Sequence, residues 1–290
     1  MQDLFRHALL ACLLLAGAQG VHAQGERGSV VISTGLEGGG YWSAGERLRA
    51  VAAEVGVDVE NRSSSGSLMN LERLFDSGSP VSLAFAQADA VEYFAGQNPE
   101  IAPAIGTLHS IGQECVFIIS RSDDDIKTLK DMRKSERMQL GIKSPQSGIW
   151  VTYHSMMQRV PGLDGATLIY GDTIERMNHL LSPLTNIDRA VMVVHGTDAH
   201  SPEIEMAAKD PDNYRFVDIE DERLTRAVDG GEPLYQRKKV RSGVAEESGK
   251  VETICVRGLL VANRNKLTSA QFDAVQGFVQ ARWAEIHPEP

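Results

Sequence analysis

The stretch that most constrains the fold runs from Val30 to Leu48, where the sequence predicts a strand, a glycine-rich turn and a helix in that order. Its first three residues form a β-branched run typical of a buried strand, and apolar residues at helical spacing begin at Tyr41. This order places backbone N–H groups at a helix N-terminus, where the partial positive charge favours an anion. The stretch therefore predicts an anion-binding turn. The alternative is a tight turn whose glycines only permit positive φ.

The spacing of the glycines in this turn does not match the common nucleotide-binding patterns. Gly35, Gly38, Gly39 and Gly40 do not form G-x-G-x-x-G, and no Gly-Lys-Ser/Thr sequence follows them. A nucleotide or dinucleotide site is therefore poorly supported.

The order of strand, turn and helix recurs along the chain. Val57–Asn61 reads as a strand, and the serine-rich turn after it leads into a helix for which Ser67 or a neighbouring serine is the expected N-cap. Val81–Ala86 reads as the next strand and Ala90–Gly96 as its helix. Three successive units of this kind predict a mainly parallel sheet, with ligand contacts collected at the carboxyl ends of its strands.

The order of strand, turn and helix occurs again in the second half of the chain. Met138–Ile142 is a predicted strand followed by a polar turn and a helix, and Ala166–Tyr170 and Ala190–Val194 are further strands with polar residues at their ends. The polar run 237–250 is expected to be an exposed loop or an irregular hairpin, and Thr253–Ala262 a long apolar strand.

The N-terminal 23 residues have the composition of a secretory signal peptide. Arg6 precedes a short apolar run, and Val21-His22-Ala23 offers small residues for cleavage before Gln24. A membrane anchor is the less favoured alternative because the apolar run is too short to span a bilayer. We therefore expect the mature protein to be soluble and located in the periplasm.

Charge and cysteine content narrow the possible partners. The formal net charge of −10 argues against nucleic acid. Cys115 and Cys255 are the two cysteines that follow the predicted signal peptide, and each lies in a strand-like run. In an oxidising compartment they could form a disulfide, and the alternative of two buried free thiols stays open.

Three of these segments together resemble a known family. The strings S-T-G-L-E-G-G-G-Y-W-S-A-G, S-S-S-G-S-L-M-N-L-E-R-L-F-D-S-G and L-A-F-A-Q-A-D-A are similar to the periplasmic solute-binding subunits of TRAP transporters, specifically the TAXI group. The resemblance covers roughly Val30–Gly96 and is weaker over Leu129–Arg159, where Gln146 and Ile149 depart from the pattern.

The resemblance implies a fold and a function. The fold is α/β, of the type II periplasmic-binding-protein kind, with two α/β lobes joined by crossover strands and a ligand closed between them. Lobe 1 would comprise residues 24–116 and 256–290, and lobe 2 residues 117–255. The ligand would be a small organic acid or an amino acid such as glutamate, delivered to the membrane subunits of the transporter. A periplasmic ligand sensor or adapter with the same cleft is the alternative.

The candidate ligand-binding residues combine the strand ends with the positions that match the family. Lys143 or Arg62 would neutralise a carboxylate, and the alternative for each is a solvated surface cation, above all for Arg62. Asp89 and Asp172 would accept from a ligand ammonium or, alternatively, cap helices. His195 is either a ligand contact or a satisfied histidine at a sheet edge, and of Tyr41 and Trp42 one is expected in the core. The full set is Thr34, Gly38, Gly39, Tyr41, Ser64, Ser65, Gly66, Ser67, Gln87, Asp89, Lys143, Ser144, Gln146, Ser147, Gly148, Asp172 and His195.

Catalysis is not predicted. Ser64, Ser67 and His195 invite a hydrolase interpretation, but no G-x-S-x-G elbow surrounds these serines. No H-E-x-x-H or cysteine ligand set points to a metal either. We therefore expect a monomeric binding protein with no cofactor and no metal.

Overall fold

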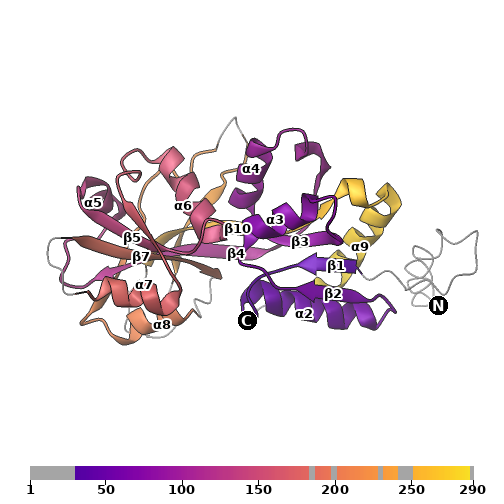
Figure 1. Cartoon of the computed structure of the whole chain (residues 1–290), viewed down its shortest axis with the longest axis horizontal. Helices are drawn as coiled ribbons and strands as arrows, with labels where there is room; N and C mark the ends of the chain where they lie inside the picture. Colours follow the sequence, from indigo (N-terminus) through magenta and orange to yellow (C-terminus); the bar gives the residue numbers. More distant parts are fainter. Residues whose placement is uncertain (1–29, 183–186, 197–200, 228–230, 241–250, 288–290) are drawn as a thin grey trace, which may run out of the picture. The chain divides into compact units, whose positions relative to one another are not determined.

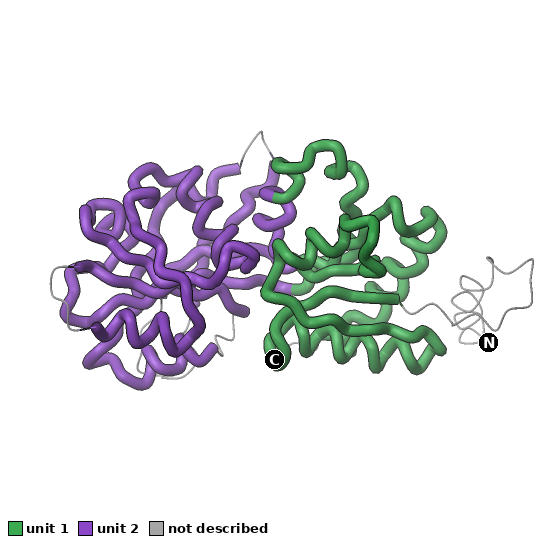
Figure 2. Tube along the Cα trace, viewed as in Figure 1, with its two compact units in different colours: residues 1–86, 94–111, 259–290 green, residues 87–93, 112–258 purple. Residues whose placement is uncertain are grey.

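A computed structural model describes residues 30–182, 187–196, 201–227, 231–240 and 251–287. The predicted signal peptide lies outside these residues. The chain divides into two compact units (Figure 2). Unit 1 comprises the chain up to Ala86, Phe94–Ile111 and the chain from Leu259 on, and unit 2 comprises Gln87–Tyr93 and Gly112–Gly258.

Unit 1 is built from the predicted succession of strands and helices. Strand β1 (Val30–Ser33) pairs in parallel with β2 (Val59–Arg62) and with β3 (Val81–Gln87). Helix α2 (Gly40–Ala53) follows β1 and α3 (Ser67–Phe75) follows β2. The pairing sets Ser33 opposite Arg62, so the two turns begin at the same edge of the sheet.

The C-terminal part of the chain completes unit 1. The remaining helices are α4 (Ala88–Gln97), which begins in unit 2, η1 (Ala102–Ala104), η2 (Arg264–Lys266) and α9 (Ser269–Ile286). Helix α9 packs on α2, and Arg47 of α2 donates from Nε to the carbonyl of Ile286 at 2.6 Å. The shared core includes Ile32, Leu48, Phe85, Leu260, Phe272 and Val279, which are all buried.

Unit 2 contains a second group of parallel strands. Strand β5 (Met138–Ile142) pairs in parallel with β6 (Thr167–Tyr170) and with β7 (Asp188–Gly196). Figure 1 shows α6 on one side of these strands and α7 and α8 on the other. The helices of the unit are α5 (Leu129–Lys134), α6 (Gly148–Arg159), α7 (Thr173–Leu180) and α8 (Pro202–Lys209).

Antiparallel strands make the sheet mixed, which corrects the prediction of a mainly parallel sheet. Strand β4 (Ile105–Arg121) pairs antiparallel with β7 and with β8 (Tyr214–Val217), and β9 (Tyr235–Val240) pairs antiparallel with β10 (Val251–Asn263). Strand direction depends on how the connections return the chain, and local sequence does not encode that path.

Residues 237–240, the start of the predicted loop or irregular hairpin at 237–250, belong to strand β9, whose antiparallel pairing with β10 agrees with the hairpin alternative. Residues 241–250 lie outside the described residues. The ends of β9, Tyr235 and Val240, are buried, whereas Arg237 and Lys239 between them pair with Glu252 of β10.

Three strands pass from one unit into the other. They are β3, β4 and β10, and the chain crosses between the units within each of them. Residues 87–93, 112–116 and 256–258, which the predicted bounds assigned to lobe 1, belong to unit 2. Within the described part of the chain, no helix has the length and apolar content needed to cross a membrane.

Candidate functional site

Two predicted ligand turns of unit 1 lie side by side at the carboxyl ends of β1 and β2. The backbone N–H of Thr34 donates to the carbonyl of Arg62 at 2.9 Å, and that of Ser64 donates to the carbonyl of Gly35 at 3.1 Å. The Ser64 hydroxyl donates to the carbonyl of Thr34 at 3.1 Å. The structure therefore brings together the glycine turn and the serine turn, which are far apart in the sequence.

The hydroxyls of Thr34 and Ser64 fix these turns from the inside. Thr34 is fully buried, and its Oγ1 donates to Oδ1 of Asn61 at 2.7 Å. Gly45 of α2 allows this approach, because a Cβ at Gly45 would lie 2.6 Å from Oδ1 of Asn61. Both hydroxyls thus hold the backbone in position. At the first turn, Gly38 is among the residues that are exposed to solvent.

The sequence interpretation missed Asn70 and Arg73 of α3, which also hold the site. Asn70 is fully buried; its Oδ1 accepts from the Ser33 hydroxyl at 2.6 Å, and its Nδ2 donates to the carbonyls of Phe85, at 2.8 Å, and Thr34. Arg73 donates from Nη1 to the carbonyl of Ser63 at 2.6 Å. Asparagine is unfavourable inside a helix unless its side chain has such a role. The position of Asn70 within the predicted helix could therefore have indicated its structural role from the sequence.

Both helices that follow these turns begin at a glycine. Gly39 is the N-cap residue of α2 and Gly66 that of α3, and neither can supply a side-chain acceptor. The expected serine cap of α3 is wrong because the chain enters the helix with φ +144° and ψ −166° at Gly66, a conformation essentially restricted to glycine. By contrast, five other α-helices of the described residues have an N-cap whose side chain accepts a hydrogen bond. These N-caps are Thr128, Ser147, Asp172, Ser201 and Thr268.

A surface depression of about 530 Å³ lies beside these turns in unit 1. Trp42 and Arg62 line it, whereas the half-buried Tyr41 packs its ring on the core residue Phe85 with centroids 5.4 Å apart. Arg62 is paired with Glu60 through Nε and Oε1 at 2.5 Å, and 40% of its side chain is exposed. The other lining residues are Glu37, Asn61, Ser63, Arg73, Asp76, Ser79, Pro80 and Val81.

A second group of candidates lies at the strand ends of unit 2. The parallel pairing sets Ile142 of β5 opposite Tyr170 of β6, so the turn at Lys143 and the turn at Asp172 begin at one edge. His195 lies at the end of β7, half-buried and opposite Cys115 of β4. Ser144 and Gln146 are exposed, and Ser147 caps α6 by accepting from Trp150 N–H at 3.2 Å.

Lys143 is the cation of this second group. Its side chain is half-buried, and the described residues give its ammonium no hydrogen bond and no ion pair. Burial lowers the pKa of Lys143, the charge of Arg176 lowers it further, and the carboxylate of Glu203 acts in the opposite direction. Lys143 therefore carries a charge that is partly removed from water and not neutralised by direct contact.

Arg176 and Glu203 form a buried ion pair next to Lys143. Neither side chain is more than 3% exposed, and Nη2 of Arg176 donates to Oε1 of Glu203. Nη1 of Arg176 donates to the carbonyl of Met192 at 2.9 Å, and Thr173 Oγ1 donates to Glu203 Oε1 at 2.8 Å. Sequence reasoning did not find this pair because it did not predict α8, which carries Glu203.

Asp172 caps a helix, which is one of the two roles predicted for it. Its Oδ1 accepts from the backbone N–H of Glu175 at 2.9 Å, and Oε2 of Glu175 accepts from the N–H of Asp172 at 2.9 Å. This reciprocal capping box begins α7. Its role as a ligand contact stays a prediction.

Gln87, the last residue of β3, and Asp89, in the first turn of α4, are both buried and belong to unit 2. The Asp89 carboxylate accepts hydrogen bonds from Thr152 and Tyr235, so its visible contacts are with protein hydroxyls.

Among the residues that the structure describes, no cluster of three or more His, Cys, Asp or Glu could hold a metal ion.

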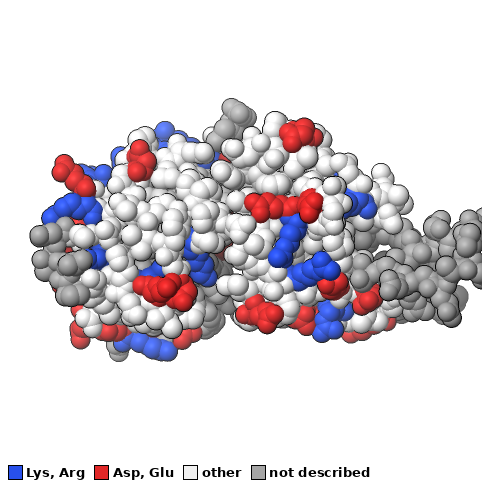
Figure 3. All heavy atoms as spheres, viewed as in Figure 1, with Lys and Arg blue, Asp and Glu red and all other residues white. Residues whose placement is uncertain are grey.

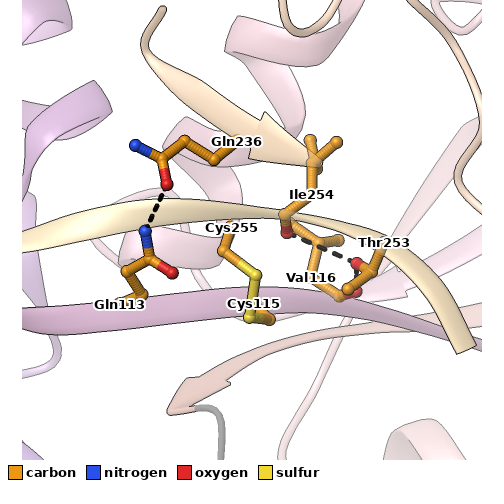
Figure 4. The surroundings of a disulfide bond; sticks show 7 residues. All are labelled: Gln113, Cys115, Val116, Gln236, Thr253, Ile254 and Cys255. Atoms are coloured by element: carbon orange, nitrogen blue, oxygen red, sulfur yellow. Dashed lines mark hydrogen bonds between the residues drawn. A yellow bond between two sulfur atoms is a disulfide. The ribbon is translucent and has the colours of Figure 1, made fainter. Parts of the chain in front are cut away.

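Cys115 and Cys255 are joined by a disulfide in unit 2 (Figure 4). Of the two alternatives for these cysteines, the structure contains the bonded one. Both residues are buried, and the bond links β4 to β10 across a sequence separation of 140. Next to it, Gln113 donates from Nε2 to Oε1 of Gln236 at 2.7 Å, and Thr253 donates to the carbonyl of Val116.

Comparison with solved structures identifies the fold. The chain is similar to YhfZ from Shigella flexneri, with a TM-score of 0.52, 11% identity and coverage of 99% of this chain and 95% of YhfZ. It is similar to the CA3427 gene product of Candida albicans, described as having the generic periplasmic binding protein fold, with a TM-score of 0.51, 12% identity and coverage of 89% and 72%. A mutant of ArgBP from T. maritima has a TM-score of 0.50, 10% identity and coverage of 90% and 92%.

No protein-family model and no curated protein matches the sequence. At these identities the structural similarity establishes the fold and leaves the TAXI group unconfirmed. The predicted α/β fold with crossover strands is confirmed: the chain has the type II periplasmic-binding-protein fold, built from two α/β units.

Proposed function

We propose that this protein is a periplasmic solute-binding protein for a small organic acid or amino acid, and that it delivers its ligand to the membrane subunits of a TRAP-type transporter. The fold supports the binding role, and the three sequence strings that resemble the TAXI group support the type of transporter. The disulfide between Cys115 and Cys255 suits an exported protein, because such bonds persist in oxidising compartments.

The proposal of an anionic ligand rests on one observation: the ammonium of Lys143 is half-buried and has no ion pair among the described residues. Lys143 is half-buried, so its ammonium loses hydration, and within the described part of the chain no ion pair replaces that hydration. Glu203, whose carboxylate acts on the pKa of Lys143, already accepts from Arg176 and Thr173. A ligand carboxylate would restore the missing interaction, and a charge-assisted hydrogen bond of this kind is worth about 1.5–3 kcal/mol.

The turns of unit 1 supply a second group of proposed contacts. Helices α2 and α3 both start at glycines, so their first turns present N–H groups that no N-cap side chain accepts from. Helix N-termini of this kind favour negative charge by about 0.3–1 kcal/mol each near the surface. The exposed Gly38 and Gly40 and the half-buried Trp42 flank the first of these N-termini.

The proposal is tested by calorimetric titration of the purified mature protein with a panel of mono- and dicarboxylic acids and amino acids. We expect at least one carboxylate to bind, and K143M to weaken its affinity tenfold or more. K130M is the matched control, because Lys130 is exposed and lies on α5. Absence of binding across the panel, or equal affinities for K143M and the wild type, would refute the role of Lys143.

Delivery to a transporter is tested separately. Tagged protein from the periplasmic fraction is expected to co-purify with multi-spanning membrane subunits encoded beside its gene when ligand is present. Co-purification with a receptor instead would favour a ligand sensor with the same fold.

The mass of the periplasmic protein reports whether cleavage occurs between Ala23 and Gln24.

A further inference from the structure

The segment Gln87–Tyr93 is a short excursion of the chain into unit 2. Ala86, just before it, and Phe94, just after it, both belong to unit 1. The segment contains the end of β3 and the first part of α4. Contacts that hold such a short segment in unit 2 must therefore come from very few side chains.

Asp89 contributes two hydrogen bonds to these contacts from a buried position. It is 1% exposed, and its Oδ2 accepts from Thr152 Oγ1 of α6 at 2.6 Å and from Tyr235 Oη of β9 at 2.8 Å. Its Oδ1 accepts from the backbone N–H of Ala90 at 2.8 Å. Tyr235 and Thr152 are themselves fully buried. One carboxyl group thus joins α4 to two other elements of unit 2.

The charged groups around this network pair with one another and leave Asp89 without a counter-ion. On α4, Glu92 accepts from Nη2 of Arg159 at 2.9 Å. On α6, Arg159 also donates to Oγ of Ser155 at 2.6 Å and lies over the Tyr235 ring, with its Cζ 5.7 Å from the centroid. On β9, Tyr235 is the ionisable group that contacts Asp89. Among the described residues, no Lys, Arg or His forms an ion pair with Asp89.

We propose that Asp89 is a buried latch that fastens Gln87–Tyr93 to unit 2 as a neutral carboxylic acid and loosens the segment when it ionises. A hydroxyl both donates and accepts, so a protonated Oδ2 can donate to Thr152 or Tyr235 while the network stays intact. An ionised carboxylate in the same place is buried without a cation, which is costly even with three donors. This inference stands on the network alone and does not depend on the proposed function.

The direction of the pH dependence follows from this environment. Burial raises the pKa of Asp89, and the hydrogen bonds from Thr152, Tyr235 and Ala90 reduce that rise without cancelling it. The native state then holds the Asp89 proton more tightly than the unfolded state, whose carboxyl titrates near about 3.9. As the pH rises from there to the native pKa, this group lowers the stability of the native state, by up to about tenfold in the unfolding constant per pH unit.

The test compares the urea unfolding of the wild type and D89N from pH 4 to pH 9. Asparagine keeps the Oδ1 acceptor and replaces Oδ2 by an uncharged donor, so D89N imitates the neutral form. We expect the ratio of the wild-type to the D89N unfolding constant to rise with pH and to level off at the native pKa. D125N is the control, because Asp125 is exposed and its ratio is expected to stay constant.

Two further measurements keep the inference open to refutation if D89N folds poorly. In the wild type, the side-chain carbon resonance of Asp89 is expected to titrate with a midpoint above the ordinary value of about 3.9. Exchange protection of residues 87–93, corrected for intrinsic rates, is expected to fall as the pH rises. A midpoint at or below the ordinary value, or a ratio that is constant or falls with rising pH, would overturn the proposal.

Discussion

At the scale of single residues, the polar side chains of the unit 1 turns mainly hold the backbone in place. Thr34, Ser64 and Asn70 are buried, and each has its polar atoms engaged with other protein groups. This arrangement holds the two turns in place through contacts within the protein, as the proposed binding role requires. Preorganised backbone donors bind without the cost of ordering them, which favours affinity.

Substitution of Asn70 tests this positioning role. N70A removes the partner of Ser33 Oγ and two donor bonds to the carbonyls of Phe85 and Thr34. We expect the free energy of unfolding to fall by about 1–3 kcal/mol or more, because buried polar groups lose their partners. N98A is the control, since Asn98 makes one partly buried bond to the carbonyl of Phe94. Equal losses in the two variants would contradict the role of Asn70.

The sequence predicted which residue types stand at the strand ends, but not which of them face solvent. Thr34 and Ser64 are buried, whereas Ser144 and Gln146, equally polar, are exposed. The difference arises from side chains of other segments, such as Asn61 against Thr34. Exposure is a tertiary property, so a local pattern of hydroxyls and glycines does not determine it.

At the scale of elements, a polar side chain at the start of a helix can have a structural role, as an N-cap, or a binding role, as a ligand contact. Asp172 shows the distinction, because its carboxylate caps α7 and the same group was predicted to contact the ligand. A cap requires only an acceptor, which serine also supplies, whereas binding of a ligand ammonium requires negative charge.

Two substitutions of Asp172 therefore give different results. D172A is expected to lower the free energy of unfolding by about 1 kcal/mol through loss of the cap, and D172S to retain most of the stability. Ligand affinity measured on D172S then reports on charge alone: a tenfold loss would support the ligand contact, and an unchanged affinity would limit Asp172 to capping. A D172A variant as stable as the wild type would contradict the capping assignment.

The predicted elements were most reliable where hydrophobic runs and turns coincide, as in β1, β3 and β5. Helix α8 was not predicted, and residues 237–240 of β9 were predicted only as part of a loop or an irregular hairpin. Helix α8 is only eight residues long, and β9 has a polar sequence whose strand conformation depends on backbone pairing with β10. Short elements of this kind are stabilised by neighbours that are distant in sequence.

At the scale of the whole molecule, the distribution of charge on the surface limits how a carboxylate could be attracted in the proposed function. Acidic and basic side chains are interspersed on the face seen in Figure 3, and the net charge is −10. A carboxylate ligand must therefore be attracted by local cations such as Lys143 and not by the overall charge. This attraction acts at short range because salt screens charges beyond roughly 8–10 Å.

The disulfide is expected to contribute substantially to the stability of unit 2. It closes a loop with a sequence separation of 140, and loss of such a cross-link costs about 2–5 kcal/mol in small exported domains. The double variant C115A/C255A is therefore expected to unfold at a lower urea concentration than the oxidised wild type. Reduction should lower the wild-type midpoint and leave the variant unchanged. A wild-type midpoint that does not respond to complete reduction would contradict this expectation.

The fold could be predicted from the sequence to a greater extent than the ligand. Repeated strand-turn-helix units determine an α/β architecture through local patterns, and the structural comparisons confirm the periplasmic-binding-protein fold. Ligand identity depends on a few side chains whose contacts are set by the tertiary structure. Lys143 illustrates this, because the charges that act on it belong to Arg176 of α7 and Glu203 of α8, which are distant in the sequence.

The most direct test of the central claim is a calorimetric comparison of one ligand acid with its uncharged amide, on the wild type and on K143M. If Lys143 binds the carboxylate, the wild type will prefer the acid by at least about tenfold, and K143M will lose most of that preference. An equal preference for the acid in both proteins, or no preference in the wild type, would contradict the account.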